Sequence, residues 1–150
     1  MTERAARRPD KLSVVVFAGN FEKVHYALAA ACAAAAIDMP ATLFFTMGAC
    51  RALLAADAAG APGWHALSLE RPGFADAAAL DASMRARGVA GFEELIEACA
   101  ALGVRVLACE MGLRAMGLDG APLRADLKIE IGGLVTFLTD ASADGAMLFV

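Results

Sequence analysis

Two patterns of apolar positions alternate along the chain. Short continuous runs rich in Val, Ile, Leu and Phe predict strands that are buried on both faces. Stretches with apolar residues three and four positions apart predict helices. The expected strands span residues 12–18, 41–46, 104–109, 127–130 and 146–150, and the expected helices span 21–36, 49–58, 75–87, 92–102, 111–116 and 134–142. This order predicts an α/β fold of three layers (α/β/α), with a five-stranded parallel sheet between helices.

The pattern also predicts how the chain is divided. Residues 1–11 are mostly charged or polar, and we expect them to form a disordered N-terminal tail. Residues 12–150 are expected to form a single domain. Within that domain, 60–91 reads as an insertion broken by glycines and prolines. A connection of this length either serves as a lid or partner-binding loop, or is a solvated insertion with Trp64 packed onto the core.

Composition narrows the class of protein. Hydrophobic residues make up 59% of the chain and charged residues 20%, as in a folded domain. The net charge of -4 argues against nucleic-acid binding, which normally needs a basic surface. The longest apolar stretch, 26–37, is shorter than the roughly 18 residues of a membrane span. The apolar run after Arg7 and Arg8 is too short for a secretory signal, so we predict a cytoplasmic protein.

The chain has four cysteines and two histidines. Their spacing matches no zinc-binding pattern, so we expect no metal site. Neither a Walker A motif nor a G-x-G-x-x-G turn follows a predicted strand, and we expect no cofactor. Cys32 and Cys99 fall on or beside apolar faces of predicted helices and are interpreted as packing residues.

Cys109 is the strongest candidate for chemistry. It ends a predicted strand and precedes a predicted helix. In open parallel sheets, ligands bind outside the carboxyl ends of the strands, where the following helices begin. Amide groups at a helix start favour a thiolate over a thiol, which makes the sulfur more nucleophilic. Glu110 would oppose this effect if its carboxylate pointed inward. Met111 and Met116 would either surround the sulfur with an adaptable apolar surface or pack in the core.

Other residues are expected at the same edge of the sheet. Cys50 begins the helix after the second strand and is a candidate second thiol, although a small packing residue would serve equally well there. Gly19 and Asn20 follow the first strand, and Gly132 follows the fourth, so these residues are expected to line the site. Asn20 also has the chemistry of a helix cap. His25, in the first turns of the first helix, is expected on the surface.

The chain resembles the DsrE/DsrF-like family, most closely its DsrE-like sulfur-trafficking subfamily. The resemblance covers residues 12–150 and is carried by Val-Val-Val-Phe-Ala-Gly-Asn-Phe-Glu-Lys-Val-His (14–25), Leu-Phe-Phe-Thr (43–46), Glu-Glu-Leu-Ile (93–96), Ala-Cys-Glu-Met-Gly-Leu-Arg-Ala-Met-Gly (108–117) and Ile-Glu-Ile-Gly-Gly with Thr-Phe-Leu (129–138). It implies a flavodoxin-like fold, oligomers, and a cysteine that accepts a persulfide from a rhodanese or a TusA-like carrier. That cysteine falls on Cys109.

Two functions follow from these observations. The first is a cytoplasmic sulfur carrier or sulfurtransferase that accepts and passes on a persulfide through Cys109, with sulfur-donor and sulfur-acceptor proteins as partners. The second is a non-catalytic, homo-oligomeric binding or scaffold module with a Met-rich apolar rim. The sequence leaves open whether the protein is an enzyme. A thiol peroxidase ranks third, because the residues around Cys109 lack the proline, threonine or serine, and arginine of such enzymes.

Overall fold

The computed structural model describes residues 7–150, and in this part of the chain five parallel strands form one sheet. The strands are β1 (Leu12–Val16), β2 (Ala41–Phe45), β3 (Arg105–Cys109), β4 (Ile129–Gly132) and β5 (Ala146–Phe149). Their order across the sheet is β4-β3-β2-β1-β5, so β4 and β5 form the two edges. The parallel sheet expected from the sequence is therefore confirmed.

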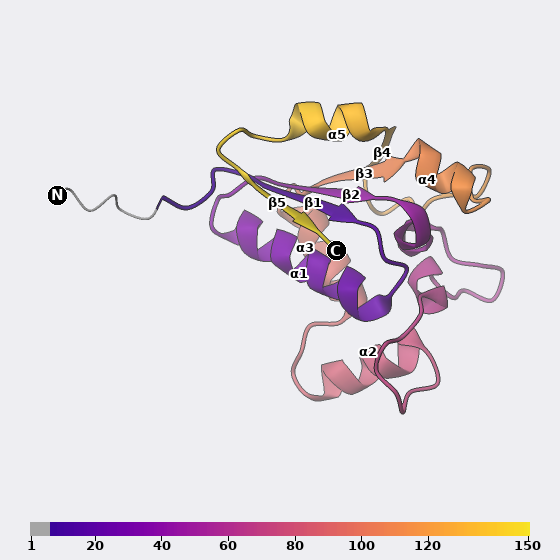
Figure 1. Ribbon diagram of the computed structural model, residues 1–150. Coiled ribbons are helices and arrows are strands. Elements are labelled where there is room, and N and C mark those ends of the chain that lie inside the picture. Colours follow the sequence, from indigo (N-terminus) through magenta and orange to yellow (C-terminus); the bar gives the residue numbers. More distant parts are fainter. Residues whose placement is uncertain (1–6) are drawn as a thin grey trace.

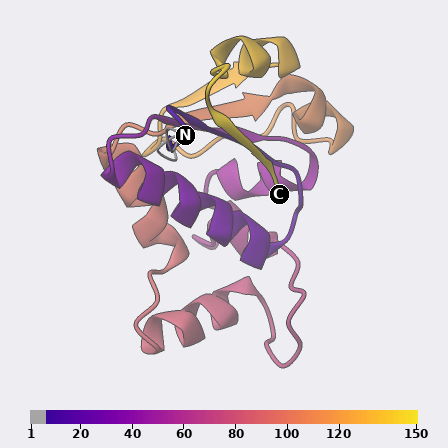
Figure 2. The ribbon, with the colours of Figure 1, turned by 60° about the vertical axis from the view of Figure 1, so that its left-hand side comes forward.

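Helices cover both faces of the sheet. They are α1 (Phe21–Ala36), η1 (Met47–Leu53), η2 (Gly63–Ala66), α2 (Ala77–Ala86), α3 (Phe92–Ala101), α4 (Glu110–Ala115) and α5 (Leu134–Asp140), where η marks a 3-10 helix. Helices α1 and α3 pack side by side against one face, and α5 lies across the other (Figures 1 and 2). The predicted three-layer α/β fold is confirmed. None of the helices in residues 7–150 is long and apolar enough to cross a bilayer.

The central strands are buried on both faces, which explains their continuous apolar sequences. Every residue of β1 and β2 is buried. Successive side chains point to opposite faces of the sheet, so Val14 and Leu43 join the large core under α1 and α3. Val15 and Phe44 instead belong to a small second core under α5. The two cores differ greatly in size, and the candidate site lies beside the smaller one.

The segment after β2 differs from the helix that was predicted at 49–58. The structure has the short 3-10 helix η1, which ends at Leu53. The carbonyl of Leu53 accepts a hydrogen bond from Arg124 N–H (2.9 Å), and Ala55 N–H donates to Pro122 O (2.9 Å). These backbone groups are therefore not free to continue a helix.

The insertion at 60–91 contributes to the core. Trp64 is 4% exposed, and its ring stacks on Phe92 at 4.8 Å between centroids. Its indole N–H donates to Glu93 Oε1 at 2.8 Å. Trp64 is packed onto the core, as one of the two alternatives expected, and it lies in the large core rather than over Cys109. A role of the segment in partner binding stays a prediction.

His25 is buried, so the expected surface position is wrong. The residue is 6% exposed. Its Nε2 lies 2.8 Å from the carbonyl oxygen of Ala90, which can only accept, so the ring donates. The hydrogen bond ties α1 to the turn that precedes α3.

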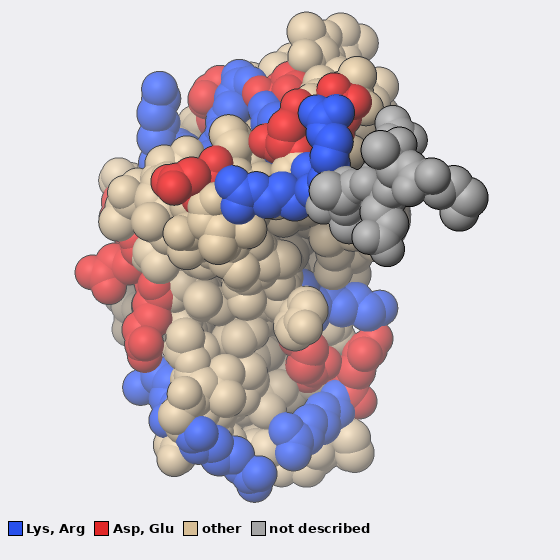
Figure 3. Space-filling model, turned by 90° about the vertical axis from the view of Figure 1, so that its left-hand side faces the viewer, with Lys and Arg blue, Asp and Glu red and all other residues tan. Residues whose placement is uncertain are grey.

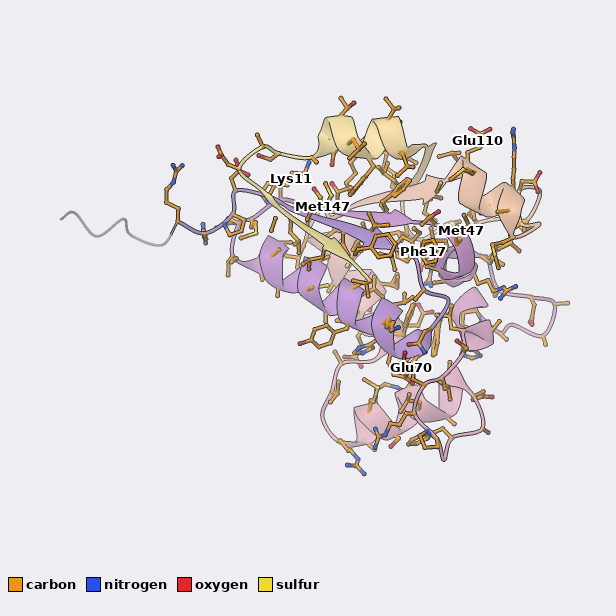
Figure 4. All side chains as sticks on the ribbon, viewed as in Figure 1. Lys11, Phe17, Met47, Glu70, Glu110 and Met147 are labelled. Atoms are coloured by element: carbon orange, nitrogen blue, oxygen red, sulfur yellow. The ribbon has the colours of Figure 1, made fainter. Side chains whose placement is uncertain are left out.

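A network of charged residues fastens the end of α5 to the amino ends of the strands. A disordered tail was expected at residues 1–11, and residues 1–6 of it lie outside the described part of the chain. Its last residue, Lys11, forms an ion pair in which Nζ lies 2.8 Å from Asp140 Oδ2. Thr42 Oγ1 donates to the same oxygen (2.6 Å), and Arg105 donates to Asp140 Oδ1 (2.6 Å). Figure 3 shows acidic and basic side chains close together near the top of the face that lies on the left in Figure 1. Figure 4 labels Lys11 at this left-hand end of the sheet.

This network predicts a loss of stability in acid. Partial burial alone would raise the pKa of Asp140, but hydrogen bonds from Lys11, Thr42 and Arg105 lower this pKa to about 2. Because the pKa of Asp140 is lower in the folded protein than in the unfolded chain, its carboxylate stabilises the fold at pH values above about 4. This stabilisation is lost as the pH falls from about 4 towards 2. Asp140→Asn should lower the free energy of unfolding by about 1–2 kcal/mol at pH 7 and flatten this acid dependence. Urea unfolding at several pH values measures both effects.

The matched control is Glu70→Gln, which breaks an exposed ion pair with Lys23. It should change the free energy of unfolding by less than about 0.5 kcal/mol. If the stability of Asp140→Asn fell in acid in the same way as that of the wild type, Asp140 would not be the source of the acid dependence.

Candidate functional site

Cys109 lies where β3 ends and α4 begins. It is the last residue of β3 and the N-cap of α4, and its Sγ accepts a hydrogen bond from Gly112 N–H at 3.4 Å. On its other side it pairs in register with Gly132 of β4. A backbone N–H aimed at sulfur stabilises the negative charge of a thiolate. The geometry therefore sets one amide donor against the Cys109 sulfur at the carboxyl end of β3.

The same sulfur is shielded from solvent. Cys109 is 1% exposed and belongs to the small core under α5, so the solvent-accessible thiol that a reactive Cys109 implies is not found. The cover includes Phe137 of α5, which is 1% exposed and stacks on Phe44 at 5.0 Å between ring centroids. The local sequence predicted that Cys109 ends a strand but not that α5 covers it, because Phe137 lies 28 residues further along the chain.

The cover is thin. Phe137 is the buried residue of the seven-residue helix α5, while Leu134, Val135 and Leu138 are 49%, 79% and 58% exposed. Gly133 precedes the helix, and Asp140 anchors its far end. An element with one buried side chain opens at low free-energy cost compared with global unfolding. Displacement of α5 would therefore uncover Cys109 without global unfolding.

A shallow depression lies beside Cys109. It is lined by Glu110, Met111, Arg114, Ala115 and Gly133. Figure 4 shows Glu110 at the end of the sheet where the strands finish, opposite Lys11. The carboxylate of Glu110 pairs with Arg114 at 2.8 Å on the surface, so it does not point inward at the thiol. Three lining residues, Arg114, Ala115 and Gly133, were not predicted.

The two methionines differ. Met111 is 56% exposed and borders the depression, in keeping with an adaptable surface near the sulfur. Met116 is partly buried, and it is the C-cap of α4. The structure thus brings Cys109, Glu110, Met111 and Gly132 together.

Cys50 is a buried thiol in η1. It is 0% exposed, and its S–H donates to Phe45 O at 3.7 Å. Burial, and next the charge of nearby Cys109, raise the pKa of Cys50 to about 12. Cys50 is therefore a protonated thiol at neutral pH, and its part as a second thiol stays a prediction.

Gly19 and Asn20 act in the scaffold. Asn20 Oδ1 accepts a hydrogen bond from Lys23 N–H at 3.0 Å and so caps α1. A Cβ on Gly19 would lie 3.0 Å from the Cα of Gly48, so the loops after β1 and β2 touch through their backbones. Neither Gly19 nor Asn20 lines the depression beside Cys109.

Exposed apolar side chains lie on α4, on α5, on the two edge strands β4 and β5, and just after β1. We call this set the apolar rim: Phe17, Met111, Ile131, Leu134, Val135, Leu138, Met147, Leu148 and Phe149, each at least 43% exposed. The rings of Phe17 and Phe149 lie 5.4 Å apart. Figure 4 shows Phe17 close to Met47, near the point where β1 and β2 end. Apolar surface of this extent commonly marks a contact with another protein.

No group of three or more His, Cys, Asp or Glu side chains within residues 7–150 is arranged to hold a metal ion. The groups gathered at the site are one thiol, the amide donor of Gly112, apolar side chains and the Glu110–Arg114 ion pair.

One comparison with known proteins shows the family, and another shows the fold. The model of the DsrE/DsrF/DrsH-like family matches residues 8–149. Among solved structures, the crystal structure of the ychN protein from E. coli superposes with a TM-score of 0.52 at 18% identity, over 93% of this chain and 99% of that one. No curated protein matches the chain in sequence.

Proposed function

The chain belongs to the DsrE/DsrF/DrsH-like family, which supports a sulfur-relay type of fold in general, and we propose that it is a cytoplasmic sulfur carrier that holds a persulfide on Cys109. The observation that carries the proposal is the position of this thiol at the end of β3, with Gly112 N–H donating to its sulfur. Persulfide exchange needs a nucleophilic sulfur and a docking surface, and little other machinery.

The transfer balances without an oxidant. The Cys109 thiolate attacks the outer sulfur of a donor persulfide, R–S–SH. The donor S–S bond breaks, the donor leaves as R–S⁻, and Cys109 becomes Cys109–S–SH. An acceptor thiolate then attacks the outer sulfur and restores the Cys109 thiolate. The amide of Gly112 stabilises the charge that sits on the Cys109 sulfur before the first step and after the second.

Partner binding and access are linked in this proposal. Cys109 lies under α5, and the outer face of α5 forms part of the apolar rim. A donor or acceptor protein, such as the rhodanese or TusA-like carrier that the resemblance implies, would dock on this rim and displace α5. The same rim supports self-association, and we infer a homo-oligomer in which a partner subunit covers part of it.

One observation favours the second candidate, a scaffold module without sulfur chemistry. The sulfur of Cys109 is buried, while the apolar rim is exposed. In that case the rim would bind partners, and the cysteine would only pack under α5.

Persulfide loading distinguishes the two functions. The protein is treated with glutathione persulfide, and its intact mass is measured. Because Cys32 is a second, partly exposed thiol, the test is made on the Cys32→Ser protein. This protein should gain one sulfur atom per chain, and adding Cys109→Ser should abolish the gain, because the nucleophile is absent. Adding Cys99→Ser instead is the matched control, since Cys99 is buried in the other core, and it should leave loading unchanged. Equal loading with and without Cys109→Ser would end the sulfur-carrier proposal and leave the scaffold.

A further inference from the structure

Two other cysteines lie side by side on the opposite face of the sheet. Cys32 of α1 and Cys99 of α3 have their sulfurs 3.2 Å apart across the contact between the two helices. The arrangement is reciprocal: the Cys32 thiol points at the carbonyl of Leu95 (3.5 Å), and the Cys99 thiol points at that of Leu28 (3.8 Å). Each carbonyl belongs to the residue one helical turn before the other cysteine.

The two thiols differ in access to solvent. Cys32 is partly exposed, whereas Cys99 is 1% exposed. Burial, and next the neighbouring Cys32 thiol, raise the pKa of Cys99 well above its ordinary value. A reagent from solvent therefore meets Cys32 first and finds a protonated thiol directly behind it.

We propose that Cys32 and Cys99 form an oxidation site, at which a peroxide converts the two thiols into a disulfide that joins α1 to α3. The Cys32 thiolate attacks hydrogen peroxide, the O–O bond breaks, and Cys32–SOH and hydroxide form. Hydroxide takes the proton of Cys99, whose sulfur attacks the sulfenic sulfur and expels a second hydroxide. That hydroxide takes up the proton that Cys32 lost on ionising. In total, two thiols and one peroxide give one disulfide and two waters.

The distances fit this chemistry. The sulfurs need to approach from 3.2 Å to the disulfide bond length of about 2.05 Å. The remaining thiols are arranged differently, because Cys109 lies in the small core under α5 and Cys50 belongs to η1. The disulfide would brace the α1–α3 layer without consuming Cys109. The inference is therefore independent of the proposed function.

The test uses hydrogen peroxide on the full chain. After treatment, free thiols are blocked with N-ethylmaleimide, and the protein is digested without reductant. The expected product is one peptide pair linked through Cys32 and Cys99. Because the link closes a long loop, Tm should rise by about 5–10 °C, and dithiothreitol should reverse the rise.

Variants assign the linkage. Cys32→Ala should abolish the linked pair and the rise in Tm, and circular dichroism checks that this variant is folded. Cys109→Ser should keep both effects, even if it has lost persulfide loading. Links that contain Cys109, or oxygen added to Cys32 with no link and no change in Tm, would overturn the proposal.

Discussion

Truncating Phe137 to alanine is expected to lower the free energy of unfolding by about 3–5 kcal/mol and to make Cys109 react with iodoacetamide about tenfold faster or more. The stability loss follows because Phe137 is 1% exposed and stacks on Phe44. The gain in reactivity follows because this ring is the buried side chain with which α5 covers the core that holds Cys109. Urea unfolding and peptide mass spectrometry measure the two effects.

Phe92→Ala is the matched control for this truncation. Phe92 is 0% exposed and stacks on Trp64, but it belongs to the large core on the other side of the sheet. It should cost a similar free energy while leaving Cys109 protected under native conditions. Alkylation of Cys99 monitors global unfolding in both variants, because Cys99 is buried in the large core. Equal protection of Cys109 in the two truncated proteins would show that Phe137 does not control access.

Substituting alanine for Gly112 is expected to lower the free energy of unfolding by about 1–3 kcal/mol. In an unconstrained helix the same change would stabilise the fold by about 1 kcal/mol. The sign of the change in the free energy of unfolding therefore shows whether the space around Gly112 is restricted. A Cβ on Gly112 would lie 2.5 Å from Met47 N and 2.6 Å from Thr46 Oγ1. Met47 N is a backbone atom and cannot rotate away. The start of α4 would have to shift, and the N–H that donates to Cys109 would shift with it, so persulfide loading should slow.

Gly120→Ala is the control for the glycine substitution. A Cβ at Gly120 would meet no atom within 4 Å, and its backbone is not left-handed. The change should alter the free energy of unfolding by less than about 0.5 kcal/mol and leave loading unchanged. A Gly112→Ala protein that is as stable and as rapidly loaded as Gly120→Ala would show that the contact between α4 and η1 is not needed.

The strands were predictable from the sequence because β1 to β3 are buried on both faces, and such strands are predominantly apolar. The position of Cys109 was predictable for a related reason. A strand that ends at a thiol and leads into a helix puts that thiol at the carboxyl edge of a parallel sheet. Both inferences need only local sequence.

What failed depended on contacts between distant segments. His25 was expected on the surface, but the turn at Ala90 provides a carbonyl for its ring. The predicted helix at 49–58 is cut short because residues 122–124 bind its backbone. The neighbourhood of Cys32 and Cys99 depends on how α1 packs on α3. Spacing along one chain segment contains no information about such pairings.

Two kinds of interaction hold helix α5, one at its middle and one at its end. An aromatic stack holds its middle, and the charged groups around Asp140 hold its end. Dissolved salt weakens the second and leaves the first almost unchanged. The rate at which the sulfur of Cys109 becomes reachable would therefore respond to ionic strength, so that the surrounding electrolyte alone would change how often this thiol is uncovered.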